Sequence, residues 1–272
     1  MRPNHLFAAA VVTLAMSASA IADVDPTDLS GPVAEYKAYV TERTERLVEG
    51  TSEFVDAIKA GDLERARALY APTRVPYEEI EPIAELFGDL DAAIDSRADD
   101  YELAEADPGF PGFHRIEYGL WAKNSTEGLE PVADKLLADV TQLRDSIADL
   151  EFPPDVVVGG AAELIEEIAE SKISGEENRY SRTDLWDFKA NVDGAHKIVE
   201  LVRPLIEDEE AEYLATVDAN FARVYDILET YEKGDGYVTY LELGESDRVT
   251  LAAAVNTLAE DLSTLRGKFG LD

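Results

Sequence analysis

The stretch EGLEPVADKLLADVTQLRDSIADLE, residues 127–151, decides the fold class of this chain. Its apolar side chains recur at intervals of three and four residues, which is the period of one face of an α-helix. The sequence FPPD at 152–155 follows directly, and consecutive prolines cannot continue a helix. The stretch therefore predicts a long amphipathic helix that ends at the clearest internal boundary of the chain.

The same helical period extends toward the N-terminus. Residues 31–62 form a long predicted helix whose apolar positions are Tyr36, Tyr39, Val40, Leu47, Phe54, Val55 and Ile58. A shorter helix is predicted over 63–72, ended by Pro72. The sequence from 76 to 101 is predicted to continue as helix, with a kink or a restart at Pro82.

Beyond the boundary the pattern is again helical. Helices are predicted near 155–173, 184–207, 208–233 and 245–267. Residues 234–247 alternate as a strand would, but we interpret them as a loop. Because other β-branched runs of strand length are missing, the sequence predicts an all-α, bilobal protein. Its lobes would be two tandem antiparallel four-helix bundles, at residues 30–150 and 155–272.

The first residues have a different character. MRPNHLFAAAVVTLAMSASAIAD begins with a basic residue, continues with an apolar run, and ends in small residues. This order is typical of a secretory signal peptide and is too short for a membrane span. We therefore predict a signal peptide at residues 1–22 and a mature chain in the periplasm without a membrane span. The absence of cysteine excludes disulfides.

The chain is strongly acidic, with a formal net charge of −34. The electrostatic field of this negative charge attracts cations and repels the phosphates of nucleic acids. Nucleic acid is therefore excluded as a partner. The acids are spread along the whole chain, however, as on a solvated surface suited to a salt-rich habitat. Charge alone therefore does not identify a metal-binding protein.

A more specific signal is the sequence GFHRIEYGLW at 112–121. On a helix, His114 and Glu117 share one face, with Cβ atoms about 5–6 Å apart, and they could offer a nitrogen and an oxygen to one ion. Glu78 and Glu81 have the same spacing. If both were buried and ionised they would repel each other, unless a cation or a proton lay between them. For His114 and Glu117, the alternative is an ordinary hydrogen-bonded or half-buried pair.

The same residues argue against hydrolysis. A zinc peptidase of the usual kinds needs HExxH or HxxEH, whereas Glu117 is followed by Tyr118. No cysteine nucleophile and no GxSxG sequence is present. The motif therefore favours binding over catalysis. Imidazole with carboxylates suits iron, and also zinc, copper or manganese.

Three long segments carry a resemblance to a known family: YEEIEPIAELFGDLDAAID (77–95), GFHRIEYGLW (112–121) and YSRTDLWDFKANVDGA (180–195). Together they resemble the imelysin-like family, in its EfeO/EfeM branch of periplasmic iron-uptake components. The resemblance implies a pair of four-helix bundles with a metal site between them, centred on the HxxE motif. Carried over to this chain, the implied metal ligands are His114, Glu117, Glu78, Glu81, Asp95 and Asp184.

The resemblance also implies a cargo and partners. The implied cargo is iron, with zinc or copper as alternatives, in an uptake system of the EfeUOB type. The implied partners are an inner-membrane iron permease and a periplasmic peroxidase-like protein. The chain departs from the branch in two ways: it lacks a cupredoxin-like domain, and it has Arg182 where some relatives have histidine. Two other functions remain open, which are metal-assisted binding of an anionic polysaccharide such as alginate and, ranked last, metallopeptidase activity.

Overall fold

The computed structural model describes residues 28–170 and 172–271. The signal peptide predicted at residues 1–22 lies outside the described residues. The all-α class is confirmed, because the regular structure in the described ranges is helical apart from one hairpin of two-residue strands, β1 (Glu232–Lys233) and β2 (Gly236–Tyr237). The prediction that residues 234–247 form a loop is wrong in part, because this range contains β2, a short 3-10 helix at Tyr240–Glu242 and the start of a helix at Glu245.

Most of the helices follow the predicted segments, and the exceptions lie between residues 72 and 101. The described α-helices are α1 (Ser30–Lys59), α2 (Leu63–Glu78), α3 (Gly88–Asp95), α4 (Gly112–Glu117), α5 (Glu130–Ile147), α6 (Pro154–Glu170), α7 (Asp184–Val202), α8 (Ala211–Glu229), α9 (Glu245–Leu262) and α10 (Leu265–Lys268). Short 3-10 helices join them: η1 (Glu81–Phe87), η2 (Ala98–Asp100), η3 (Ala104–Ala106), η5 (Lys172–Ser174), η6 (Arg203–Leu205) and η7 (Tyr240–Glu242). A π-helical turn, η4 (Tyr118–Ala122), follows α4 directly.

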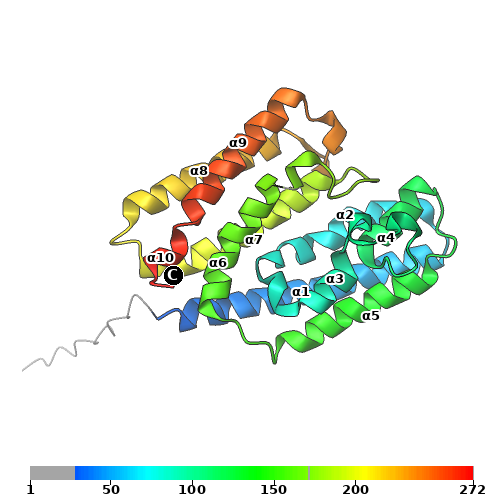
Figure 1. Cartoon of the computed structure of the whole chain (residues 1–272), viewed down its shortest axis with the longest axis horizontal. Helices are drawn as coiled ribbons and strands as arrows, with labels where there is room; N and C mark the ends of the chain where they lie inside the picture. Colours follow the sequence, from blue (N-terminus) through cyan, green and yellow to red (C-terminus); the bar gives the residue numbers. More distant parts are fainter. Residues whose placement is uncertain (1–27, 171, 272) are drawn as a thin grey trace, which may run out of the picture.

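The helices of the two predicted ranges occupy different sides of the molecule. In Figure 1, α1 packs beside α2 and α5 on one side, while α8 and α9 pack together on the other. Between them α7 contacts α2, and α6 contacts η1. The division into two separate four-helix bundles stays a prediction, because one buried hydrophobic cluster contains residues of both ranges.

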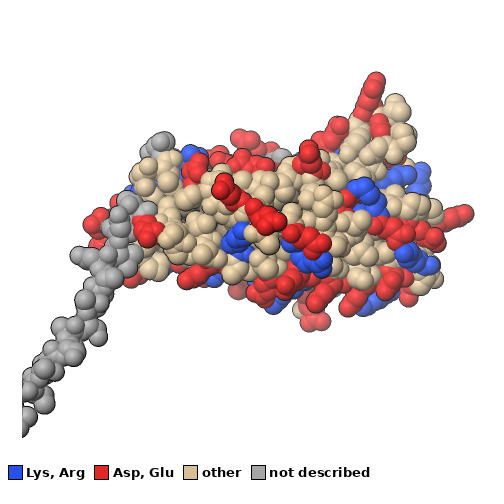
Figure 2. All heavy atoms as spheres, turned by 90° about the horizontal axis from the view of Figure 1, so that it is seen from below, with Lys and Arg blue, Asp and Glu red and all other residues tan. Residues whose placement is uncertain are grey.

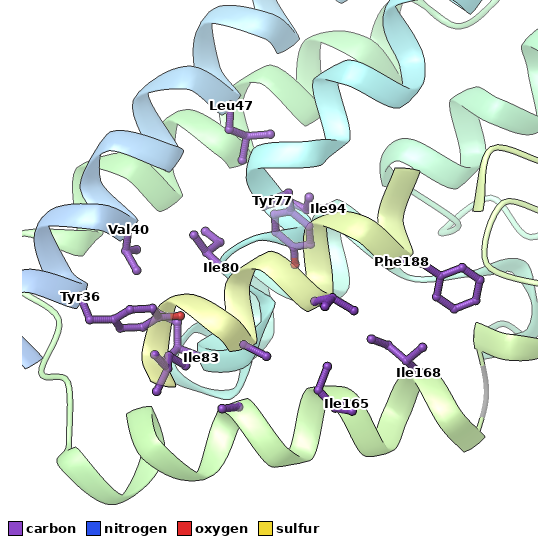
Figure 3. Close-up of a cluster of buried hydrophobic side chains, with 14 of the residues drawn as sticks. Tyr36, Val40, Leu47, Tyr77, Ile80, Ile83, Ile94, Ile165, Ile168 and Phe188 are labelled. Atoms are coloured by element: carbon purple, nitrogen blue, oxygen red, sulfur yellow. The ribbon is translucent and has the colours of Figure 1, made fainter. Parts of the chain in front are cut away.

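Figure 3 shows how this shared core is built. Tyr36, Val40 and Leu47 project from α1 at the intervals of one helix face. Tyr36 points toward Ile83 of η1, while Ile165 and Ile168 project from α6 on the other side of the cluster. All of these residues belong to one buried cluster, together with Phe188 of α7. Burial of each large apolar side chain is worth about 1.5–3 kcal/mol. The periodic apolar positions read from the sequence therefore face a single core.

The prediction that Pro72 ends a helix is wrong, because α2 runs through Pro72 and Pro76 to Glu78. A proline inside a helix costs stability through the lost hydrogen bond and its ring contacts. Tertiary interactions offset that cost here, since Tyr70 and Arg74 on this helix are both fully buried. The predicted continuous helix over 76–101 instead breaks after Glu78 and restarts as η1 around Pro82, as expected there.

Two glycines allow the segment between α2 and η1 to approach α6 and α7 closely. A Cβ atom at Gly194 of α7 would lie 2.3 Å from the carbonyl oxygen of Glu79. A Cβ atom at Gly160 of α6 would lie 1.9 Å from the carbonyl oxygen of Pro82. Any larger residue would force the backbones apart, so these glycines fix where the acidic side chains of this segment lie.

The surface matches the acidic composition. On the face drawn in Figure 2, Asp and Glu side chains are spread over the length of the molecule, with Lys and Arg between them. None of the helices in the described ranges is both long enough and apolar enough to cross a membrane.

Candidate metal centre

The sequence HxxE lies on the short helix α4. This helix starts at Gly112, whose φ of +72° and position against the carbonyl oxygen of Ile94 exclude a side chain. His114 and Glu117 are both buried, and His114 Nδ1 lies 3.3 Å from Glu117 Oε2. The two side chains therefore contact each other on one helix face, as their spacing predicts.

Glu117 is held on its other oxygen by the loop before α7. Its Oε1 accepts hydrogen bonds from the backbone N–H groups of Tyr180 (3.0 Å) and Ser181 (2.7 Å) and from the Ser181 hydroxyl (2.9 Å). This carboxylate therefore fixes both the loop and the imidazole. A proton on Nδ1 of His114, donated to Glu117, leaves Nε2 free to act as a ligand.

Nε2 of His114 faces two carboxylates. It lies 3.5 Å from Asp95 Oδ1 and 3.7 Å from Glu177 Oε1, and it has no hydrogen-bond partner among the described residues. These three ligand atoms lie within 4.8 Å of one another. We call Asp95, His114 and Glu177 the triad. One nitrogen and two carboxylate oxygens around a common point form a ligand set that fits iron, zinc, copper or manganese.

Solvent reaches the triad from one side. A cavity of about 400 Å³ lies against Asp95 and Glu177, and acidic side chains line it further out, among them Asp91 and Asp100. Arg97 contributes to the same lining, with Nη1 2.9 Å from Glu177 Oε2. The cavity is large enough for a hydrated cation, and its charge favours cations over anions.

A buried arginine balances part of the negative charge of the carboxylates around the triad. The guanidinium of Arg74, on α2, contacts Glu78 and Asp95, lies 3.4 Å from Glu177 Oε1, and lies 3.4 Å from Asp187 Oδ1. Arg74 is fully buried. A buried arginine is stable only when its charge and its N–H groups are satisfied in this way.

The surroundings of the His114 imidazole favour its protonated form. Burial and the nearby guanidinium of Arg74 both lower the pKa of His114, but they are outweighed. The charge of Asp95 and the polar contacts with Glu117 and Glu177 raise the pKa of His114 to about 10. A metal that binds at Nε2 at neutral pH would therefore displace a proton.

The cation between Glu78 and Glu81 is a lysine. Nζ of Lys172 lies 2.6 and 2.8 Å from the two carboxylate oxygens of Glu81 and 3.4 Å from Glu78 Oε2. Asn191 on α7 donates to the same two carboxylates at 2.6 and 3.0 Å. The structure thus places Glu78 and Glu81 beside the triad but not in it.

Asp184 is also buried near the loop that carries Glu177, at the first turn of α7. Its Oδ1 accepts from the backbone N–H of Asn178 at 3.3 Å, and its Oδ2 has no hydrogen-bond partner among the described residues. Burial is the main cause that raises the pKa of Asp184 to about 6. Asp184 is not one of the three residues that converge on His114 Nε2.

Of the six ligands expected from the sequence, His114 and Asp95 meet in the triad, and the third member, Glu177, was not expected. Glu177 lies in a loop, 63 residues after His114 in the sequence, where no periodic pattern could place it. Arg74 was missed as well, although its i,i+4 spacing to Glu78 is a signal for a helical ion pair. Lys172 offered no such signal.

Comparison with known proteins identifies the family of the chain. Residues 32–265 match the model of the imelysin family, and the chain therefore belongs to that family, as its motifs predict.

Individual relatives are similar over most of the chain. It is 58% identical over 255 residues to the iron uptake system component EfeM of Pseudomonas syringae pv. syringae (strain B728a), covering 93% of this chain and 90% of that protein. It is 55% identical over 263 residues to the iron uptake system component EfeO of Escherichia coli (strain K12), covering 95% of this chain and 70% of that protein. These relatives are named as uptake components and not as enzymes.

Proposed function

We propose that this chain is a periplasmic metal-binding component of an iron-uptake system and that it captures its cargo at the triad. The observation that carries the proposal is the buried Nε2 of His114, which has no hydrogen-bond partner among the described residues and faces the carboxylates of Asp95 and Glu177. When the imidazole is protonated, this nitrogen forms ion pairs with both carboxylates, and a metal ion can take the place of that proton. The identity to EfeM and EfeO supports iron as that ligand.

The residues around the triad have separate roles in this proposal. Asp95, His114 and Glu177 hold the cation. Glu117 orients the imidazole from the far side, as partners of metal-bound histidines commonly do. Glu78 and Glu81, which the sequence suggested as ligands, instead hold Lys172, and Asp184 contributes negative charge without direct contact. The acidic cavity admits a hydrated cation, whose waters are then replaced by protein ligands.

Iron is the proposed cargo because of the relatives, and not because of the donor atoms. The same donors also bind zinc, and they bind copper more tightly than iron. Export through the signal peptide at residues 1–22 would place the chain in the periplasm. There it would deliver iron to an inner-membrane permease, together with a peroxidase-like partner.

We propose binding and not hydrolysis for a reason of geometry. In a zinc peptidase, the glutamate of the motif acts as the general base on a metal-bound water. Here Oε1 of Glu117 already accepts three hydrogen bonds from Tyr180 and Ser181, and its Oε2 contacts His114. A carboxylate engaged in this way is poorly placed to accept a proton from water.

The proposal is tested by calorimetric titration of chelator-stripped protein with Fe(II) under anaerobic conditions and with Zn(II). We expect one tight site in the wild type and an affinity loss of more than about 100-fold in His114→Ala and in Glu177→Gln, since each removes a ligand. His196→Ala is the matched control, because His196 stacks on Phe221 of α8 and belongs to another part of α7. Equal affinities of His114→Ala and His196→Ala would refute the site.

A further inference from the structure

The most unusual feature of the centre is that Arg74 contacts the oxygens that the triad offers to a metal. Asp95 Oδ1, which lies 3.5 Å from His114 Nε2, is the atom that Nη1 of Arg74 contacts. Glu177 Oε1, which lies 3.7 Å from Nε2, is the atom that lies 3.4 Å from Nη2 of Arg74. Guanidinium and metal would therefore compete for the same two oxygens.

Both cations cannot use these oxygens fully at the same time. A carboxylate oxygen engaged with a guanidinium is a weaker metal ligand, and two cations held a few ångströms apart repel each other strongly where water is excluded. Arg74 is fully buried, so solvent does not screen this repulsion. Binding of a metal at the triad therefore requires Arg74 to withdraw from at least one of the two oxygens.

Arg74 can withdraw without losing all its partners. Its Nη2 also contacts Glu78, and its Nε lies 3.4 Å from Asp187 Oδ1. Neither residue belongs to the triad. An arginine keeps its charge at every accessible pH, so this exchange of partners needs no proton.

We propose that Arg74 is a tethered counter-cation that exchanges with the metal at Asp95 and Glu177, an inference that rests on the proposed function. When the metal leaves, the guanidinium returns to the two carboxylates, so the site never holds unbalanced negative charge. Arg74 thereby weakens metal binding and speeds metal release. A carrier that must give up its cargo needs this property as much as it needs affinity.

A purely positioning role for Arg74 predicts the opposite change in metal affinity. If Arg74 only positioned Asp95 and Glu177 for the metal, its removal would weaken metal binding. If it competes, its removal strengthens binding. The direction of the affinity change in Arg74→Gln therefore decides between the two.

Arg97→Gln is the matched control. It also removes a positive charge from beside Glu177, but Arg97 contacts Glu177 through Oε2, which is not the oxygen nearest His114. A general electrostatic effect of losing a positive charge near Glu177 should therefore appear in both variants, and it should be weaker in Arg97→Gln because Arg97 is partly exposed to solvent. We expect Arg74→Gln to bind Zn(II) about tenfold or more tightly than Arg97→Gln, because two charge-assisted hydrogen bonds no longer compete. Equal or weaker binding by Arg74→Gln would overturn the proposal.

If Arg74→Gln does not fold without metal, a second variant that retains the positive charge still tests the proposal. Arg74→Lys keeps the cation, but a single ammonium nitrogen on a shorter side chain cannot reproduce the separate contacts that Nη1 and Nη2 of the planar guanidinium make with Asp95 and Glu177. We expect Arg74→Lys to fold, to bind Zn(II) more tightly than the wild type, and to release it more slowly to excess chelator. Faster release from Arg74→Lys than from the wild type would overturn the proposal.

A measurement on the wild type gives an independent answer. NMR of the arginine side chains, with Arg74 assigned by its loss in Arg74→Lys, reports how well its Nη1 protons are protected from exchange with water. Addition of Zn(II) should reduce this protection, because the Asp95 carboxylate then binds the metal and no longer accepts a hydrogen bond from Nη1. Full retention of the protection in the zinc-loaded protein would contradict the exchange. A wild type that binds no cation at all would instead refute the proposed function.

Discussion

Lys172 offers the sharpest test of how the charges of the centre stabilise the fold. Its ammonium is buried, within 2.8 Å of both carboxylate oxygens of Glu81, 3.4 Å from Glu78 Oε2 and 3.1 Å from Asn191 Oδ1. Replacing Lys172 by Met keeps the length of the side chain and removes the charge. Two buried carboxylates then lose a cation that they share.

The expected loss is large. Removing one partner of a buried ion pair costs about 3–5 kcal/mol, because the remaining charge stays buried and uncompensated. In a protein of this size each kcal/mol lowers the melting temperature by roughly 2–4 °C. The metal-free Lys172→Met protein should therefore melt roughly 10 °C below the wild type.

Acid should relieve part of this loss. Burial raises the pKa of Glu81 well above its usual range, Lys172 opposes that rise, and Glu78 adds to it. Without Lys172 the pKa of Glu81 in the folded state rises further. Between the pKa of the unfolded chain and the raised pKa of the folded protein, the folded state binds more protons, so its stability increases as the pH falls through this window.

Urea unfolding followed by far-UV circular dichroism, at about pH 8 and pH 5 on chelator-treated protein, measures both effects. Lys189→Met is the matched control, because Lys189 forms a half-exposed pair with Asp193 and such pairs contribute only about 0–1 kcal/mol. We expect Lys172→Met to be far less stable than Lys189→Met at pH 8 and closer to it at pH 5. Equal losses at both pH values would refute the reasoning.

Three further predictions concern other parts of the centre. Glu117→Gln should weaken Zn(II) binding about 10- to 100-fold without removing a ligand, because the imidazole loses the carboxylate that orients it; calorimetry that finds unchanged affinity would contradict this role. Asp184 has a pKa raised to about 6, so the folded protein binds the extra proton and should lose stability, on the order of 2 kcal/mol, as the pH rises from about 4 to 6. Urea unfolding at pH 4.5 and 7 should show that Asp184→Asn lacks this loss of stability. The same pH dependence in the variant and the wild type would contradict this role of Asp184. Gly194→Ala should destabilise the protein by several kcal/mol, since its Cβ would lie 2.3 Å from the carbonyl oxygen of Glu79; a melting temperature within about 2 °C of the wild type would show that the backbone adjusts at little cost.

The fold could be predicted from the sequence because it depends on a local signal. The apolar period of residues 31–62 and 127–151 specifies which face of each helix is buried, and α1 and α5 bury those faces. The same local reasoning failed at Pro72, where α2 continues. The rule that proline ends a helix describes an isolated segment, whereas this helix is held by buried contacts from α1 and α7.

The site could be predicted only in part. Its local contacts could be predicted from the sequence, and its tertiary contacts could not. The contact of His114 with Glu117 is a property of one helix face, so the spacing of the motif was enough. The approach of Glu177 to His114 depends on a loop that is fixed by hydrogen bonds to Glu117 from Tyr180 and Ser181. Those hydrogen bonds join segments that are far apart in the sequence, and no residue pattern within the loop predicts them.

The acidic segment illustrates what a sequence can and cannot say about charge. Glu78 and Glu81 at i,i+3 correctly implied that something positive lies between them, because two buried carboxylates cannot stay ionised alone. The sequence could not say whether this would be a proton, a metal or a side chain. Here it is the ammonium of Lys172, from the other half of the chain. A tethered cation already occupies this pair, and we therefore propose the imidazole of His114, whose Nε2 faces Asp95 and Glu177, as the place where a mobile cation is gained and lost.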